Sequence, residues 1–128
     1  MSLSANIRTH FVDWVELLSD VDAQTKYEKD VPFVPVYIEL FETFNDLYVP
    51  SDAAFTAAFT AEEARRLADL NQLLDAAREK VEVVDIHSVA QLQALPEWQT
   101  VIGRAQELRE VFRKAANQSS EPPPRADH

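Results

Sequence analysis

One stretch of this chain, from Thr60 to Val84, constrains its fold more than any other. It opens with a capping box, in which the Thr60 oxygen accepts the backbone N–H of Glu63 and the Glu63 side chain accepts that of Thr60. After the box, apolar residues recur at spacings of three and four: Leu67, Leu70, Leu74, Ala77 and Val81. Polar residues occupy most other positions, so the stretch predicts a helix with one apolar face. Such a helix must bury that face against other elements.

Three further segments show the same spacing and predict three more long helices. The first runs from Ser4 to about Asp20, the second from about Pro35 to just before Pro50, and the last from Pro96 to residue 116. Their apolar stripes are Ile7, Phe11, Trp14, Leu18 and Val21 in the first, Tyr37, Phe41, Phe44 and Tyr48 in the second, and Trp98, Val101, Ala105, Leu108 and Phe112 in the last. Buried together, four such faces predict an all-α protein, an antiparallel four-helix bundle.

The segment 22–35 is expected to be a polar connection, because Pro32 and Pro35 keep its end out of a continuous helix. The stretch Val34–Ile38 has strand-like composition, so a strand there is an alternative to the start of the second helix.

Short extra helices are expected at 52–59 and at 89–95, the second after a capping box formed by Ser88 and Gln91. Phe55 and Phe59 are expected to plug one end of the bundle. We expect a single helical domain over residues 1–116 and a disordered tail over 117–128.

Composition narrows the classes of function. The 128 residues include one glycine and no cysteine, which disfavours sheets, nucleotide-binding glycine loops, disulfides and thiolate chemistry. A net charge of −10 argues against direct binding of nucleic acid through its phosphates. Neither a secretory signal nor an apolar run long enough to span a membrane is visible. We therefore expect a cytoplasmic protein without a membrane partner.

The most informative surface feature is a pair of acidic rows on the first two long helices. The members are Asp13, Glu16 and Asp20 on the first helix, and Glu39, Glu42 and Asp46 on the second. No lysine or arginine interrupts either row, although like charges at this spacing each destabilise a helix by about 0.2–0.5 kcal/mol. The later helices mix signs, as Glu62 and Arg66 do. The rows are either a solvated surface that keeps the protein soluble or a surface that binds a basic partner.

Neither a catalytic site nor a metal site is indicated. Carboxylate metal sites in bundles use Glu-x-x-His pairs, and none of His10, His87 and His128 lies three residues after a glutamate. No motif for an activated nucleophile is present. We expect no enzymatic activity, no metal and no cofactor.

These features predict a small acidic helical module that binds a protein. The specific hypothesis is an inhibitor, immunity or antidote-type protein, whose acidic rows cover a basic surface of the kind that binds nucleic acid. The alternative is a homodimeric structural or regulatory adaptor with the aromatic-rich second helix at the subunit interface.

Overall fold

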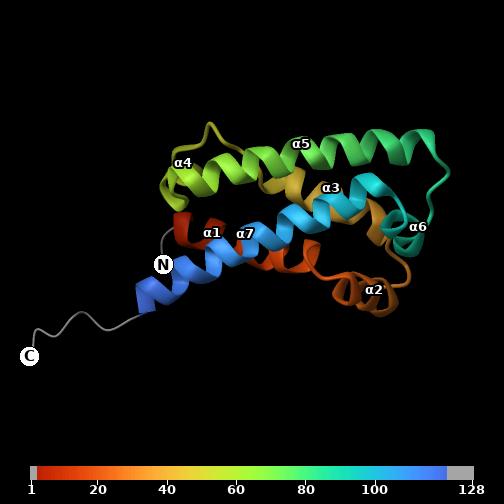
Figure 1. Ribbon diagram of the computed structural model, residues 1–128, viewed down its shortest axis with the longest axis horizontal. Coiled ribbons are helices and arrows are strands. Elements are labelled where there is room, and N and C mark those ends of the chain that lie inside the picture. The colour runs from red at the N-terminus through yellow and green to blue at the C-terminus, as the bar shows by residue number, and fades with distance from the viewer. Residues whose placement is uncertain (1–2, 121–128) are drawn as a thin grey trace, which may run out of the picture.

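The computed structural model describes residues 3–120 and shows an all-helical protein (Figure 1). Residues 1–2 and 121–128 lie outside the described part. The seven helices of the described part are α1 (Leu3–Leu18), α2 (Val21–Asp30), α3 (Val36–Leu47), α4 (Ala53–Ala58), α5 (Ala61–Val83), α6 (Val89–Gln93) and α7 (Pro96–Ser120). The predicted all-α fold is confirmed. The strand alternative at Val34–Ile38 is wrong, because α3 begins at Val36 and residues 3–120 contain no strand.

The four long helices α1, α3, α5 and α7 form the body of the molecule. α5 packs along α7, α7 packs along α1, and α3 contacts both α1 and α5. Figure 1 shows α5 and α7 side by side with opposite chain directions, with α4 at one end of the molecule and α2 and α6 at the other. The short helices therefore cover the ends of a bundle whose length is set by the long ones.

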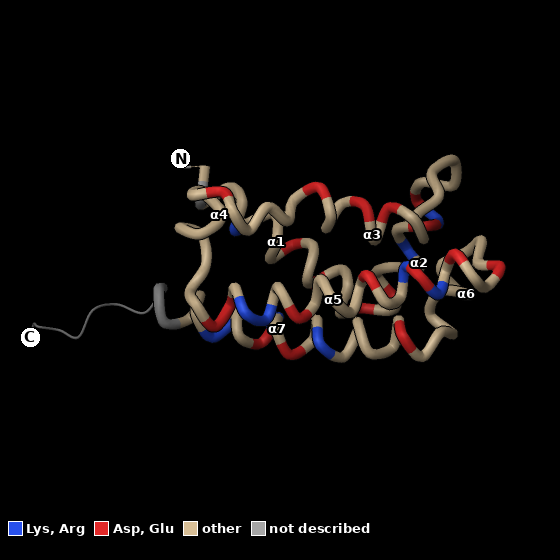
Figure 2. The backbone as a smooth tube through the Cα atoms, turned by 90° about the horizontal axis from the view of Figure 1, so that it is seen from above, with Lys and Arg blue, Asp and Glu red and all other residues tan. Residues whose placement is uncertain are grey.

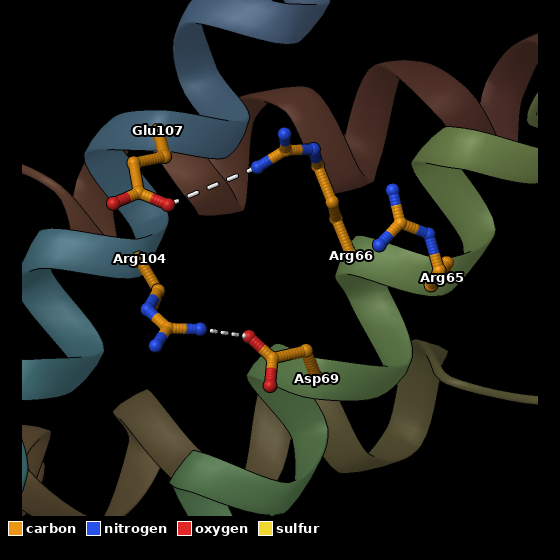
Figure 3. A pocket seen from close by; sticks show the side chains of 5 residues that line it. All are labelled: Arg65, Arg66, Asp69, Arg104 and Glu107. Carbon is orange, nitrogen blue, oxygen red and sulfur yellow. Dashed lines mark hydrogen bonds and ion pairs between the residues drawn. The ribbon is translucent and has the colours of Figure 1, made fainter.

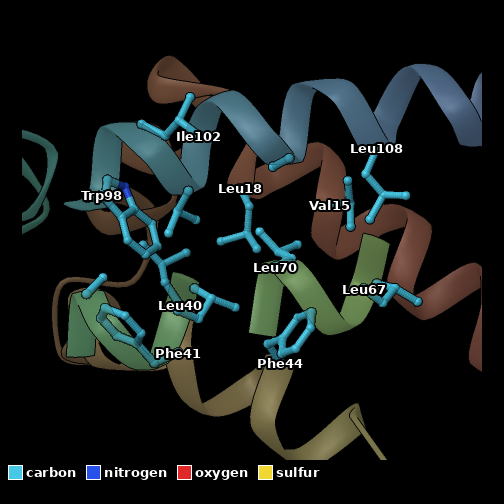
Figure 4. Close-up of a cluster of buried hydrophobic side chains, with 14 of the residues drawn as sticks. Val15, Leu18, Leu40, Phe41, Phe44, Leu67, Leu70, Trp98, Ile102 and Leu108 are labelled. Atoms are coloured by element: carbon cyan, nitrogen blue, oxygen red, sulfur yellow. The ribbon is translucent and has the colours of Figure 1, made fainter. Parts of the chain in front are cut away.

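A cluster of apolar side chains fills the space between the long helices (Figure 4). Its fully buried members come from every long helix, for example Phe11 from α1, Leu40 from α3, Leu70 from α5 and Trp98 from α7. Most of the predicted stripe residues belong to this cluster, while Trp14 is half-buried and packs against it. The three-four spacing thus identified most of the buried residues, but not Val21, which begins α2 and is 39% exposed.

The capping box predicted at the start of α5 is present. The Oγ1 atom of Thr60 accepts the Glu63 backbone N–H at 3.1 Å, and Glu63 Oε1 accepts the Thr60 backbone N–H at 2.9 Å. These two bonds satisfy backbone donors that a helix start would otherwise leave free. They fix where α5 begins and therefore which of its faces meets the core.

The polar connection expected over residues 22–35 is corrected by the structure, because its first part forms α2. Asp20 caps this helix, its Oδ1 accepting the Ala23 backbone N–H at 3.1 Å. α2 lacks a broad apolar stripe and is instead held by polar groups. The buried Gln24 side chain accepts from Trp98 Nε1 at 3.1 Å and donates to the Leu18 carbonyl at 3.0 Å. This helix therefore docks on the bundle through buried hydrogen bonds together with the packing of Tyr27 against the core.

Both expected short helices form, as α4 and α6. Asp52 caps α4 and Ser88 caps α6, each through a side-chain oxygen that accepts a backbone N–H. Phe55 and Phe59 are buried, and both rings meet Phe11 edge-on, with centroid separations of 5.6 and 5.5 Å. The expected plug at this end of the bundle is confirmed.

The last helix extends beyond its predicted end. α7 reaches Ser120, past residue 116, and the remainder of the expected tail, residues 121–128, lies outside the described residues. Among the helices of residues 3–120, none combines the length and the apolarity that crossing a bilayer requires.

Candidate functional site

The predicted acidic row of α3 lies on the outer side of that helix. Glu42 and Asp46 are exposed and Glu39 is half-buried, whereas Phe41 and Phe44 face the core. The three acids are the only charged residues of α3. Figure 2 shows red without blue along α3, while α5 and α7 carry both colours. We call Glu39, Glu42 and Asp46 the α3 acidic surface.

The α3 acidic surface is only weakly compensated by basic side chains. Glu42 Oε2 lies 3.6 Å from Arg78 Nη2 of α5, and both side chains are close to half exposed. An exposed pair at this distance stabilises a protein by about 0–1 kcal/mol. Within residues 3–120, the carboxylates of Glu39 and Asp46 form no ion pair or hydrogen bond. Two of the three negative charges are therefore available to an outside partner.

The acidic row predicted on the first helix is divided among different roles. Glu16 pairs with Arg113 of α7 at 3.0 Å, and Asp20 caps α2. Asp13 is exposed, and its side chain makes no such contact with the described residues. Glu16 and Asp20 thus have partners within the chain, whereas Asp13 has none among the described residues, so the six predicted acids differ in their contacts.

An apolar groove opens beside the α3 acidic surface, between α3 and the end of α5. Tyr37, Ile38 and Phe41 line it from α3, and Val81 and Ile86 line it from α5 and the loop that follows. Glu42, Glu82 and Arg78 form its polar edge. Its volume is about 290 Å³. We call this hollow the α3–α5 groove; the sequence did not predict it, although Tyr37 and Val81 both belong to predicted stripes.

A second hollow, polar and about 300 Å³ in volume, lies between α5 and α7 (Figure 3). Arg104 donates to Asp69 at 2.6 Å across it, and Arg66 Nη1 lies 3.8 Å from Glu107. Arg65 also lines it and pairs with Glu62 at 3.0 Å. Each arginine therefore already has a carboxylate partner, so the hollow has no free positive charge to attract an anion.

Sequence reasoning did not find the ion pair between Arg8, which is partly exposed, and the buried Glu63. Arg8 of α1 donates to both carboxylate oxygens of Glu63 at 2.7 Å and to the Ala58 carbonyl at 2.9 Å. The Arg8 hydrogen bond lowers the pKa of Glu63, against the upward effect of burial, and the Thr60 backbone N–H lowers it further. The sequence showed Glu63 as a capping residue but contained no local sign of Arg8. This pair joins α1 to the start of α5, so we assign it to the fold.

Within residues 3–120, no three histidine, aspartate or glutamate side chains gather closely enough to hold a metal ion. A comparison of the chain with models of protein families, with curated proteins and with solved structures finds no match. The α3 acidic surface and the α3–α5 groove are therefore the features that bear on function.

Proposed function

We propose that this protein is a non-enzymatic, cytoplasmic protein-binding module, of the inhibitor, immunity or antidote type. Its α3 acidic surface covers a basic surface of a partner protein. The observation that carries the proposal is the outward-facing acidic series on a helix without a single lysine or arginine, with Glu39 and Asp46 unpaired among the described residues.

The contrast between α3 and the other long helices supports this proposal. In α5 and α7 basic residues are interspersed among the acids, and Glu62 pairs with Arg66 at 2.8 Å, although Asp75, Glu79 and Glu82 of α5 form no ion pair within residues 3–120. On α3 the same spacing brings like charges together, which destabilises the helix slightly and raises the local negative potential. A potential of one sign accelerates encounter with a partner of the opposite sign and makes binding sensitive to salt. Asp13 adds an exposed negative charge on α1.

The homodimeric alternative has less support from the arrangement of the aromatic residues. It would place the aromatic residues of α3 between subunits. Phe41 and Phe44 are instead buried within their own chain, where Phe41 meets Trp98 and Phe44 meets Phe11 with ring centroids 5.2 and 5.5 Å apart. Phe44 is 1% exposed and Phe41 5%, so these two side chains offer little surface to a second subunit.

The test compares two charge-reversal variants that change the net charge equally. E39K/D46K reverses the two unpaired carboxylates of α3. The control, E107K/E110K, reverses two exposed acids of α7 whose contacts to arginine are 3.8, 3.7 and 3.4 Å long, so little stability depends on them. Wild type and both variants are used as baits for proteins of the native host at low salt, and the captured proteins are identified by mass spectrometry.

We expect a basic protein that wild type and E107K/E110K retain and that E39K/D46K loses. Its affinity for wild type should fall steeply above ~0.15 M salt, where the screening length is about 8 Å. Equal losses from both variants would mean that net charge alone is responsible. Equal retention by all three would show that the α3 acidic surface only solubilises the protein, and either result would overturn the proposal.

A further inference from the structure

The α3–α5 groove places apolar and acidic groups side by side, and this combination specifies the partner more narrowly. We propose that the groove holds the apolar face of a basic, amphipathic helical segment of the partner, while the α3 acidic surface binds the lysines and arginines of that segment. This inference rests on the proposed function and states the chemistry of the bound segment.

The fold leaves part of the apolar lining of the groove uncovered. Ile38 lines the groove and is half-buried, yet it is not packed against the core cluster. Tyr37 and Val81 also line the groove and are only partly buried. Partly exposed apolar side chains that share one hollow indicate an interaction surface rather than isolated surface positions.

Charge complementarity identifies the occupant as basic. A smaller hollow, also between α3 and α5, shares the lining residues Phe41 and Arg78 with the groove. Their charged lining residues are Glu42, Asp75, Glu82 and Arg78. Three carboxylates and one guanidinium group thus line this part of the surface, and Glu39 and Asp46 add two more carboxylates to α3. A second copy of this chain would bring the same negative charge to the contact, whereas a segment with lysine and arginine beside its apolar face would not.

The shape of the site favours a helix as the occupant. Two helices border the groove, and an amphipathic helix lying along such a groove inserts side chains at spacings of three and four. The volume of about 290 Å³ has room for a few apolar side chains and not for a whole helix. The segment therefore lies on the surface with its anchors inserted.

The probe is a fluorescein-labelled peptide of about 16 residues, long enough to form a helix, with Leu and Phe on one face and Lys and Arg on the other. One control peptide replaces the apolar residues by Ser, and a second replaces the basic residues by Glu. Binding to the full chain is followed by fluorescence anisotropy at ~0.05 M salt, where charge interactions are weakly screened. We expect both control peptides to bind at least about tenfold more weakly, because each lacks one half of the interaction.

Three variants, each checked for helical content by circular dichroism, locate the binding. I38S should weaken binding of the amphipathic peptide about tenfold, since about two methylene equivalents of burial are lost. V49S makes the same kind of change at an exposed position outside the groove and should leave the affinity unchanged. R78Q removes the one basic side chain that lines the groove and should strengthen binding about threefold.

The outcomes separate this inference from the proposed function. If E39K/D46K weakens binding and I38S does not, the proposed function stands and the groove inference is overturned. If I38S weakens binding of the amphipathic peptide and E39K/D46K does not, charge has no role in binding and the proposed function fails. Absence of peptide binding, or equal binding of the Ser-substituted peptide, also contradicts the groove inference. So does sedimentation of wild type as a dimer that I38S dissociates, because the occupant would then be a second copy.

Discussion

The ion pair between Arg8 and Glu63 leads to an asymmetric prediction. The Glu63 side chain is 2% exposed, while that of Arg8 is 32% exposed. R8M leaves a carboxylate in the interior without its two guanidinium hydrogen bonds, and the Met side chain keeps apolar contact with the rings of Phe59 and Phe112 that Arg8 now covers. E63Q leaves a guanidinium that turns toward water, and Gln preserves the capping box. We therefore expect R8M to be the more destabilising change.

The magnitudes follow from this difference in burial. Removing one member of a buried ion pair costs about 3–5 kcal/mol. For R8M we expect about 3 kcal/mol, because the Thr60 backbone N–H still donates to the carboxylate at 2.9 Å. For E63Q we expect about 1–2 kcal/mol, the cost of weakened hydrogen bonds at a partly solvated site. The double variant R8M/E63Q should lose less stability than R8M alone, since no charge then remains buried.

The pH dependence of the unfolding free energy gives an independent check on the same pair. In wild type the pKa of Glu63 lies below its ordinary value of 4.5, so its contribution is present above that pH and is lost as the pH falls through the lowered pKa. In R8M the pKa of Glu63 lies higher than in wild type, because burial still raises it and the guanidinium no longer lowers it, so protonation relieves the buried charge at a higher pH. The gap in stability between wild type and R8M should therefore narrow as the pH falls.

The assay is urea unfolding followed by circular dichroism at pH ~7 and pH ~5, which gives the free energy of unfolding of each variant. At pH ~7 the expected loss of unfolding free energy for R8M corresponds to a fall of about 10 °C in the midpoint temperature of thermal unfolding. Two results would refute the view that an unpaired buried carboxylate causes the effect. In the first, R8M loses no more unfolding free energy than E63Q does. In the second, the difference in unfolding free energy between wild type and R8M does not change with pH.

Two further predictions concern the core. L70A and L108A each truncate a side chain that is about 1% exposed. Each should lower the free energy of unfolding by about 2–5 kcal/mol in the same urea assay. Losses below about 1 kcal/mol at both positions would contradict the assigned apolar stripes. Q24A removes the acceptor of the buried Trp98 N–H and should cost about 1–3 kcal/mol, with a change in tryptophan fluorescence; a neutral effect would show that α2 does not depend on this bond.

The long helices could be predicted from the sequence because their signals are local. The Thr60–Glu63 box and the three-four spacing behind it lie within one continuous segment, so no distant residue was needed to predict α5 or its buried face. The same holds for Phe55 and Phe59, whose spacing in an alanine background indicated a plug. Local geometry fixes which face of a helix is apolar, and an apolar face has to be buried.

α2 was missed because its stability is not local. Its start and stop signals were present, with Asp20 as the cap, Asp22 in the first turn and Lys29 in the last. What its sequence lacks is an apolar stripe to bury. The helix is held instead by Gln24, whose hydrogen-bond partner Trp98 lies 74 positions away. A local sequence pattern spans far fewer positions than this, so none could include both residues.

The amino-acid sequence alone determined the all-α fold, the buried faces of the long helices and the position of six acids in two rows. Only the tertiary structure decided what those acids do. Helix packing brings Arg113 to Glu16, yet brings no basic side chain among the described residues to Glu39 or Asp46. It also opens the α3–α5 groove beside them. The spacing of residues along a helix is set by its periodicity, whereas pairing and exposure depend on which neighbours the packing brings within a few ångströms.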